Sequence, residues 1–299
     1  MLTTALEIRY KMFDMNDELM IKPKISVVTP SYNQGQYIEE TIQSIINQNY
    51  SNLEYIIIDG GSTDNSVEVI KKYEKHLTYW VSEKDSGQSE AINKGFKRST
   101  GEILCWLNSD DVLLPGALNE VANLFERQSE LDFLNGNLVL IDSNSNILTA
   151  YFIFKPRKWY ATHGIFYVCQ PAMFWRRRIC DSIGFLKEDF HALMDMEFLI
   201  RIFENNCNIG YSEKIFAGFR IHSASKSSAR ASNVAYIRDL KELKTIHGSG
   251  YGTKPSAFYK SIYRFEKLVT GIYFRNWLFA LKWKGKKVGE INNNNCKYL

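Results

Sequence analysis

The length and composition of this 299-residue chain exclude several classes of protein. Its 45% hydrophobic and 23% charged residues are typical of a soluble globular protein, not of a disordered or collagen-like chain. Five scattered cysteines without a Cys-x-x-Cys pair argue against a zinc or redox motif and for a reducing compartment. The sequence shows neither the apolar core of a signal peptide nor a run of about 18 apolar residues, so we expect a cytoplasmic protein.

The first half of the chain alternates between strand-like and helix-like patterns. Short apolar, β-branched runs predict strands at residues 25–29, 54–59, 78–83 and 102–108. Apolar side chains spaced for one helical face predict helices at residues 37–48, 65–76, 89–99 and 115–127. This alternation indicates an α/β fold with a largely parallel sheet.

A polar cluster follows each of these four strands: SYNQG, GGSTD, KDSGQ and NSDD, in that order. Ligands of such sheets bind beyond the carboxyl ends of the strands, so the clusters predict one shared site at one edge. The second half is less regular. It predicts strands at 133–142 and 147–154 and in CQPAMFWRRR, a helix at 193–205 and a last strand in IFAGFRIH.

Several blocks in a fixed order carry a resemblance to a known family. The first region consists of ISVVTPSYNQGQYIEETIQSII with EYIIIDGGSTDNS, then SEKDSGQSEAINKGF, then GEILCWLNSDDVLLPGAL. It resembles a family 2 glycosyltransferase. A second region, from CQPAMFWRR through LMDMEF to FRIHSASKS, resembles the acceptor-side half of that family. Together the two regions span about residues 24–228.

The resemblance implies a GT-A fold. We expect a Rossmann-like, mostly parallel central sheet with helices on both faces, a smaller acceptor-side sheet and a helical C-terminal tail. The expected division is an N-terminal extension at 1–22, a catalytic domain at 23–228 and a basic, aromatic C-terminal region at 229–299. Within the catalytic domain, 23–128 is the donor half and 129–228 the acceptor half.

The implied reaction is an inverting transfer of a sugar from a nucleotide-sugar donor, with a UDP-sugar as the first expectation. The implied acceptor is a hydroxyl of a glycan or lipid-linked saccharide in polysaccharide or cell-envelope synthesis. Mg²⁺ or Mn²⁺ is the implied cofactor, since a divalent ion neutralises the charge that develops on a diphosphate leaving group. A sugar nucleotidyltransferase and a non-catalytic nucleotide-sugar-binding module are the alternatives.

The resemblance assigns nucleotide and donor binding to one set of residues: Pro30, Tyr32, Asn33, Asp59, Asp85, Asn93, Asp110 and Asp111. The family usually has Asp-Asp-Gly-Ser after the second strand, where this chain has Asp59-Gly60-Gly61-Ser62. Recognition of the base is therefore left to Asp59 or to backbone groups. Some of these residues also have a structural interpretation: Asn33 as a helix cap, Asp85 in a turn, and Asp110 and Asp111 in a turn that closes the strand.

The fourth cluster departs from the family pattern as well. The family commonly has Asp-x-Asp at this strand end, and this chain has Asn108 at the first position. The resemblance assigns metal and diphosphate binding to Asp110, and to Asp111 either a supporting position behind Asp110 or a contact with the ribose. Asn108 indicates either a looser metal dependence or a site that another ligand completes, with His222 as the first candidate.

The acceptor half contains the implied base, which takes the proton of the acceptor hydroxyl. Asp195 is the first choice and Glu197 its rival. Residues two apart on a helix do not share a face, so we do not expect both acids to point at one hydroxyl. Lys226 is expected to offset phosphate charge. The acceptor side is expected to be lined by Gln170, Trp175, Arg176 and His191.

The C-terminal tail is strongly basic. Residues 255–299 contain nine Lys or Arg and two Glu, a net charge of +7, so the rest of the chain carries −3. The same segment contains ten aromatic residues. This composition suits an anionic membrane surface and thus a peripheral location on the inner face of the membrane. The alternative is a helix packed on the catalytic domain with a solvated basic face. Nucleic acid is a poor partner because the predicted active edge is acidic.

Overall fold

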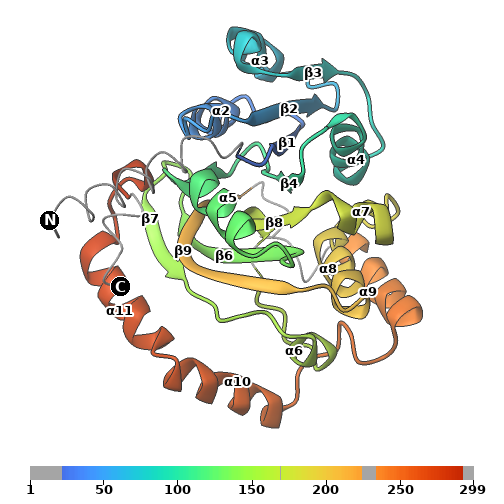
Figure 1. Cartoon of the computed structure of the whole chain (residues 1–299), viewed down its shortest axis with the longest axis vertical. Helices are drawn as coiled ribbons and strands as arrows, with labels where there is room; N and C mark the ends of the chain where they lie inside the picture. Colours follow the sequence, from blue (N-terminus) through green and yellow to red (C-terminus); the bar gives the residue numbers. More distant parts are fainter. Residues whose placement is uncertain (1–21, 169, 224–233, 292–299) are drawn as a thin grey trace, which may run out of the picture.

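The computed structural model describes residues 22–168, 170–223 and 234–291. Within them, one sheet of nine strands runs in the order β3-β2-β1-β4-β8-β6-β9-β5, and β7 pairs with β6 (Figure 1). Helices flank this sheet along most of its length. Lys226 and the segment 1–21 lie outside the described residues.

The donor half is a parallel α/β unit, as the sequence predicts. Its parallel strands are β1 (Ile25–Ser31), β2 (Leu53–Asp59), β3 (Tyr79–Ser82) and β4 (Ile103–Trp106). Its helices are α2 (Ile38–Ile46), α3 (Ser66–Lys72), the short η1 (Glu74–His76), α4 (Gln88–Arg98) and α5 (Ala117–Arg127). The parallel order places the carboxyl ends of these strands at one edge.

The acceptor half continues the same sheet instead of forming a separate one. Its strands are β6 (Phe133–Ile141), β7 (Ile147–Tyr151), β8 (Met173–Arg176) and β9 (Ile209–Arg220), and the short β5 (Val112–Leu113) of the donor half pairs with β9. Strand β8 pairs antiparallel with both β4 and β6, which joins the two halves. The other elements are α6 (Lys158–Thr162), η2 (Gln170–Ala172), α7 (Arg177–Ile183) and α8 (Met194–Glu204).

Alternation along the strands gives the sheet two buried faces. Val27 belongs to a core with Ile42 of α2 and Leu118 of α5, whereas its neighbour Val28 belongs to a second core with Phe96 of α4. Successive side chains of a strand point to opposite faces, so helices are needed on both sides. The expected α/β fold with helices on both faces is confirmed.

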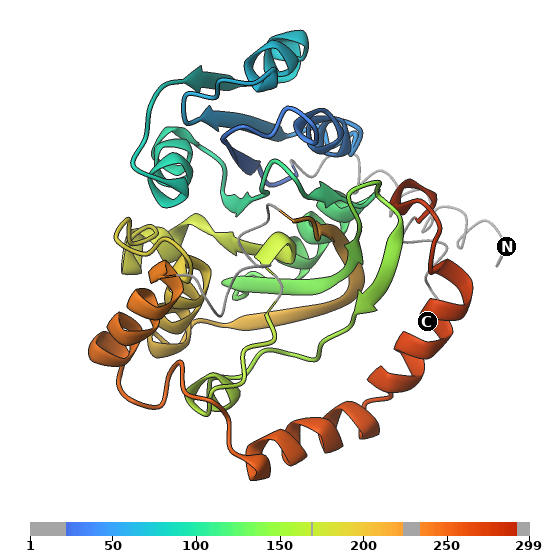
Figure 2. The same ribbon diagram turned by 180° about the vertical axis from the view of Figure 1, so that it is seen from behind.

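The C-terminal region consists of α9 (Val234–His247), α10 (Ala257–Val269), α11 (Ile272–Trp283) and η4 (Val288–Glu290). Helices α10 and α11 curve around the acceptor half in both views (Figures 1 and 2). Helix α11 packs on β7 and the segment after it, where the rings of Phe279 and Phe152 lie 5.9 Å apart. In the described part of the chain, no helix has the length and apolarity that crossing a membrane requires.

Candidate active site

A cavity of about 880 Å³ lies beyond the carboxyl ends of the donor-half strands. All four polar clusters contribute to its wall, which includes Pro30, Tyr32, Gly60, Asp85, Gln88, Asn108 and Asp110. The acceptor half and α9 supply the opposite wall, with Gln170, His191, Asp195 and Tyr236. The parallel strand order thus brings the clusters together as the sequence predicts.

The adjacent acids Asp110 and Asp111 have different environments. Asp110 lines the cavity, and its Oδ2 lies 3.0 Å from Nε2 of His222. Asp111 is fully buried, accepts a hydrogen bond from the backbone N–H of Arg220 and does not line the cavity. Burial, followed by the charge of Asp110, raises the pKa of Asp111 well above its ordinary value. Asp111 therefore supports the loop from behind the cavity, which agrees with the first of its two expected roles and corrects the expected contact with the ribose.

The buried guanidinium of Arg220 holds this loop in place. Its Nε donates to the carbonyl of Asp110, its Nη2 donates to Glu40 at 2.7 Å, and the group stacks over the ring of Tyr37. Further bonds reach the carbonyl of Asp142 and the hydroxyl of Ser145. A buried charge needs such partners, and here they connect the segments 37–40 and 142–145 to the loop that carries Asp110.

Asn108 connects the donor loops to the acceptor half. Its Oδ1 accepts a hydrogen bond from Gln88 at 2.7 Å. Its Nδ2 lies 3.2 Å from Oε1 of Gln170 and 3.3 Å from Oδ2 of Asp111. The NH₂ group of Asn108 donates to the carboxylate of Asp111 and to the amide oxygen of Gln170. An ionised aspartate at this position would have no proton to donate to either oxygen. The departure from Asp-x-Asp therefore has a structural reason.

Asp59 does not reach the cavity, which corrects its expected contact with the base. Its carboxylate is fully buried and accepts hydrogen bonds from Ser62 and Ser82 and from the N–H of Gly61. These bonds shape the loop after β2. Asp59 is thus a turn-forming residue.

Asp85 occupies the space that a second acid after β2 would need. A Cβ on Gly60 would lie 2.6 Å from Oδ2 of Asp85, which itself lines the cavity. Burial raises the pKa of Asp85, and the nearby charges of Glu90 and Asp59 add to this effect. The absence of a side chain at Gly60 therefore leaves room for the carboxylate of Asp85.

Two predicted donor residues are not part of the cavity wall. Asn33 is exposed beside it and joins the first two loops, since its Oδ1 accepts the N–H of Thr63 at 2.8 Å. Asn93 is buried on α4, where it exchanges hydrogen bonds with the backbone of Leu186 and donates one to Glu188. The burial of Asn93 corrects its expected contact with the donor, whereas the contact of Asn33 stays a prediction.

The two candidate bases on α8 are separated by burial. Asp195 lines the cavity at the start of the helix, where its Oδ1 accepts the N–H of Met196. Glu197 is fully buried behind it and forms ion pairs with Arg201 and Lys187. The acid that faces the cavity is therefore Asp195.

The family of the chain follows from its sequence. The family model described as Glycosyl transferase family 2 matches residues 26–184, more than half of the chain. The chain belongs to glycosyltransferase family 2. Among curated relatives of this family 2 protein, glycosyltransferase MJ1057 of Methanocaldococcus jannaschii is 28% identical over 213 residues, 68% of this chain and 72% of the relative.

Other relatives match over shorter stretches. TuaG of Bacillus subtilis, whose name assigns it to teichuronic acid biosynthesis, is 35% identical over 127 residues, 40% of this chain and half of TuaG. Glycosyltransferase alr2836 of Nostoc is 34% identical over 131 residues, and the match spans 41% of each protein. These matches support the family relationship, but they span only about half or less of the length of each of these two relatives.

Solved structures of glycosyltransferases share the fold. Residues 1–349 of TarS from S. aureus, in complex with UDP-GlcNAc, align with a TM-score of 0.60 and 20% identity, covering 87% of this chain and 76% of that one. The mannosyltransferase PcManGT of Pyrobaculum calidifontis, in complex with GDP-Man and Mn²⁺, aligns with a TM-score of 0.55 and 18% identity, covering 83% and 70%. Both likenesses support the GT-A fold.

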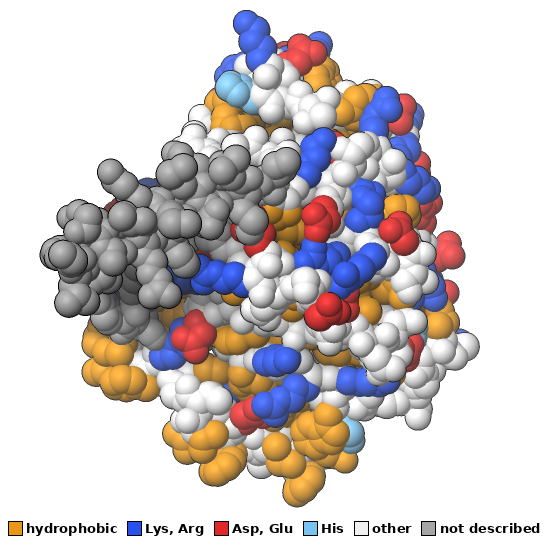
Figure 3. Space-filling model, in the orientation of Figure 1, with side chains coloured by type: hydrophobic (Ala, Val, Ile, Leu, Met, Phe, Trp, Pro, Cys, Tyr) orange, Lys and Arg blue, Asp and Glu red, His pale blue; other side chains and the backbone are white. Residues whose placement is uncertain are grey.

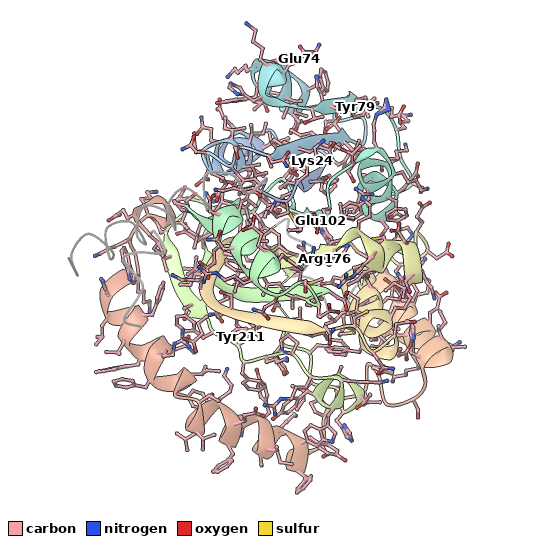
Figure 4. All side chains as sticks on the ribbon, in the orientation of Figure 1. Lys24, Glu74, Tyr79, Glu102, Arg176 and Tyr211 are labelled. Carbon is pink, nitrogen blue, oxygen red and sulfur yellow. The ribbon has the colours of Figure 1, made fainter. Side chains whose placement is uncertain are left out.

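The structure divides the predicted acceptor residues of this family 2 enzyme into two pairs. Gln170 and His191 line the cavity. Trp175 is fully buried among aromatic rings, with that of Phe198 at 5.2 Å. Arg176 binds Glu102, which directly precedes β4, and donates to the carbonyl of Leu131 (Figure 4).

The reason is the direction of β8. This strand runs antiparallel to β4, so its last residue, Arg176, pairs with Ile103 at the amino end of β4, away from the cavity. Trp175 and Arg176 are therefore structural residues, which corrects their expected acceptor role.

Helix α9 completes the site, although it lies beyond the predicted end of the catalytic domain at residue 228. Tyr236 lines the cavity. The buried carboxylate of Asp239 accepts hydrogen bonds from the backbone N–H groups of His191, Ala192 and Leu193, just before Asp195. An isolated acid in a helical segment outside the family-like blocks carries no sequence signal for this role.

The described residues contain no group of three or more His, Cys, Asp and Glu side chains that could hold a metal ion. Asp110 and His222 nevertheless fit one as a pair of ligands: Asp110 lines the cavity, and Nε2 of His222, which is not in the cavity wall, lies 3.0 Å from its carboxylate. Mg²⁺ and related ions keep several waters and take further oxygens from a substrate's phosphates, so two protein ligands suffice.

Proposed function

We propose that this family 2 glycosyltransferase transfers a sugar, with inversion, from a nucleotide-sugar donor to a hydroxyl of a glycan or lipid-linked saccharide. A UDP-sugar is the first candidate donor, and cell-envelope polysaccharide is the proposed product. The observation that carries the proposal is a single cavity lined by Asp110 from the donor half and Asp195 from the acceptor half. The named ligands of TarS and PcManGT support a nucleotide-sugar donor, and the name of TuaG supports an envelope polysaccharide.

The donor side of the cavity offers groups suited to a nucleoside. The ring of Tyr32 is 62% exposed at the cavity wall and can stack on the base. Asp85 is placed there to accept hydrogen bonds from ribose or sugar hydroxyls. Two buried polar atoms in the wall residues, Oγ of Ser31 and Nε1 of Trp106, lack a hydrogen-bond partner within the described parts of the chain. Unsatisfied buried atoms are rare in proteins, and a bound donor or a water in the cavity would supply the missing partners.

The proposed reaction is a direct displacement. The acceptor oxygen forms a bond to the anomeric carbon while the bond from that carbon to the diphosphate oxygen breaks. The electron pair leaves with the nucleoside diphosphate, and the acceptor proton passes to Asp195. One displacement on one face inverts the anomeric configuration, and it needs one base.

Asp110 and His222 are the proposed metal-binding residues. A bound Mg²⁺ or Mn²⁺ supplies positive charge for the leaving diphosphate. The chain's own contribution is the position of that pair, which Arg220 maintains by binding the carbonyl of Asp110. His222 is further held against the ring of Tyr37, at 4.8 Å between centroids.

The test is a screen of UDP-, GDP- and dTDP-sugars with Mn²⁺ and an acceptor, with release of the nucleoside diphosphate as the measurement. We expect Asp195→Asn to abolish transfer but to retain donor binding in calorimetry. Glu68→Gln, an exposed acid-to-amide change on α3, is the matched control and retains both. Transfer by Asp195→Asn at the wild-type rate would remove the assigned base. Release of pyrophosphate from a nucleoside triphosphate would indicate a nucleotidyltransferase, and binding without turnover a non-catalytic module.

A further inference from the structure

The outward side of the two tail helices is apolar. Eight large side chains along it are each 45–69% exposed: Phe258, Phe265, Leu268, Val269, Tyr273, Phe274, Trp277 and Leu281. We call this set the outer tail face. Figure 3 shows apolar side chains gathered over α10 and α11 at the lower edge of the molecule, with Lys and Arg among them. Single exposed apolar residues are ordinary, but a continuous set of this kind marks an interaction surface.

The opposite side of the same helices is already occupied. The ring of Tyr263 on α10 contacts those of Phe154 and Tyr160, at 5.6 Å each. On α11, Phe279 and Trp283 are buried against the catalytic domain. The helices therefore dock through one side and leave the outer tail face uncovered by the rest of the described chain. The alternative from the sequence is a helix packed on the catalytic domain with a solvated basic face. The helices do pack on this domain, but their outward side exposes large apolar side chains as well as basic ones.

Charge around the outer tail face is positive. Exposed basic residues flank it: Lys260, Arg264, Lys282, Lys284, Lys286 and Lys287. Glu266, one of the two acids of this segment, turns inward, where it forms an ion pair with Arg157 and accepts a hydrogen bond from Tyr160. The outward side consequently combines aromatic and aliphatic side chains with exposed basic ones.

The joint between the helices lets both present the same kind of surface. Gly271 has φ of 70°, in the left-handed region that favours glycine, and it separates helices of 13 and 12 residues. At 1.5 Å per residue these are roughly 20 and 18 Å long, too short to span a bilayer but long enough to lie along its surface.

We propose that the outer tail face docks this glycosyltransferase on a membrane surface that contains anionic phospholipid. Aromatic rings with basic neighbours are the side chains that settle at the boundary between headgroups and acyl chains. A second copy of the chain would bring two basic faces together, and nucleic acid would leave the apolar side chains in water. Only an anionic interface satisfies both the charge and the apolar side chains.

The test is co-sedimentation of the full-length protein with vesicles of phosphatidylcholine alone or mixed with phosphatidylglycerol. We expect binding to the mixed vesicles, and its loss in the triple variant Leu268→Ser/Phe274→Ser/Trp277→Ser. The variant Lys284→Gln/Lys286→Gln/Lys287→Gln should bind roughly 100-fold more weakly, since each basic residue near an anionic surface contributes about 1 kcal/mol. Truncation before α10 is unsuitable, because it would remove the buried Phe279 and Trp283.

The matched control is Val234→Ser/Ile237→Ser/Ile246→Ser, which removes three exposed apolar side chains from α9 and should leave vesicle binding unchanged. Melting temperatures show whether each variant is folded. Equal sedimentation of the wild type and the apolar tail variant, or no sedimentation of either, overturns the proposal. Unchanged vesicle binding together with dissociation of a dimer on a sizing column would make the face a subunit interface instead.

Discussion

At the scale of single residues, Asn108 shows how an apparent defect in a motif is a local adaptation. Its amide lies 3.3 Å from the carboxylate of Asp111 and 3.2 Å from Oε1 of Gln170. A carboxylate there would face the buried Asp111 without a proton to share. An amide at position 108 therefore suits the neighbouring carboxylate of Asp111 better than a second carboxylate would.

We expect Asn108→Asp to destabilise the protein by about 1–3 kcal/mol, because it removes two donated hydrogen bonds and adds a like charge. Mn²⁺ should restore part of this loss, so the melting temperature of the variant should rise more with Mn²⁺ than that of the wild type. Thermal unfolding with and without Mn²⁺ is the measurement. Asn47→Asp, an exposed change at the end of α2, is the control. Identical melting of variant and wild type under both conditions would contradict the explanation.

Asp239 is the residue that only the structure reveals. One of its oxygens accepts three backbone N–H groups from residues 191–193, which immediately precede Asp195. It touches the loop and not the cavity, so it is a positioning residue. The loop also carries His191, which lines the cavity.

Asp239→Asn should lower kcat by roughly 10- to 100-fold, since small displacements of a catalytic group are costly. The KM for the donor should stay within about twofold, because the donor loops are built on other strands. Steady-state kinetics check this split, and Glu242→Gln on the same helix is the matched control. An equal loss of donor binding and kcat would indicate general unfolding instead of misplacement of Asp195.

At the scale of elements, the amino ends of the strands are held by a buried carboxylate. Glu54 accepts hydrogen bonds from Ser26 of β1, from Thr100 and from the N–H of Gly101, which precede β4. Burial alone would raise the pKa of Glu54, but the bonds from Ser26 and Thr100, with the charge of Lys24, outweigh it and lower the pKa below 4.5.

A lowered folded-state pKa stabilises the protein above the unfolded-state pKa, and this contribution is lost as the pH falls through the folded-state value. Glu54→Gln should therefore cost about 2–3 kcal/mol at neutral pH, the loss of hydrogen bonds to a charged group. The difference from wild type should shrink as the pH falls below 4.5. Urea unfolding across this range measures it. A difference that grows on acidification would mean that the carboxyl is not ionised in the folded state.

At the scale of the whole molecule, the donor and acceptor halves form one structural unit. Strand β8 joins β4 to β6, and both cores contain side chains from the two halves. Asn93 of α4 bonds to Leu186, and Arg220 of β9 bonds to the loop after β4. The halves expected at 23–128 and 129–228 are therefore functional divisions of a single folded body.

We expect one cooperative unfolding transition, with equal calorimetric and van't Hoff enthalpies. A fragment that ends at residue 128 should not fold, because it lacks the strand that pairs with β4. Differential scanning calorimetry and circular dichroism are the measurements. Two separate transitions, or a folded fragment, would show that the halves are independent domains.

The sequence by itself determined the elements of the donor half and the edge at which the polar clusters meet. The spacing of apolar residues and the alternation of strands and helices involve residues that are close in the sequence. The elements and their parallel arrangement could therefore be predicted from the sequence. It also determined the family, through blocks that are nearly contiguous in the chain.

The resemblance already favours Asp110 and Asp195, but only the tertiary structure decided that the other acid of each pair is buried. Asp110 rather than Asp111, and Asp195 rather than Glu197, line the cavity because distant partners such as Arg220 and Lys187 take up the other acid. Asp59, Trp175 and Arg176 are likewise assigned by packing. The roles of α9 and of the outer tail face depend on contacts between segments far apart in sequence, and the local pattern of residues does not encode those contacts.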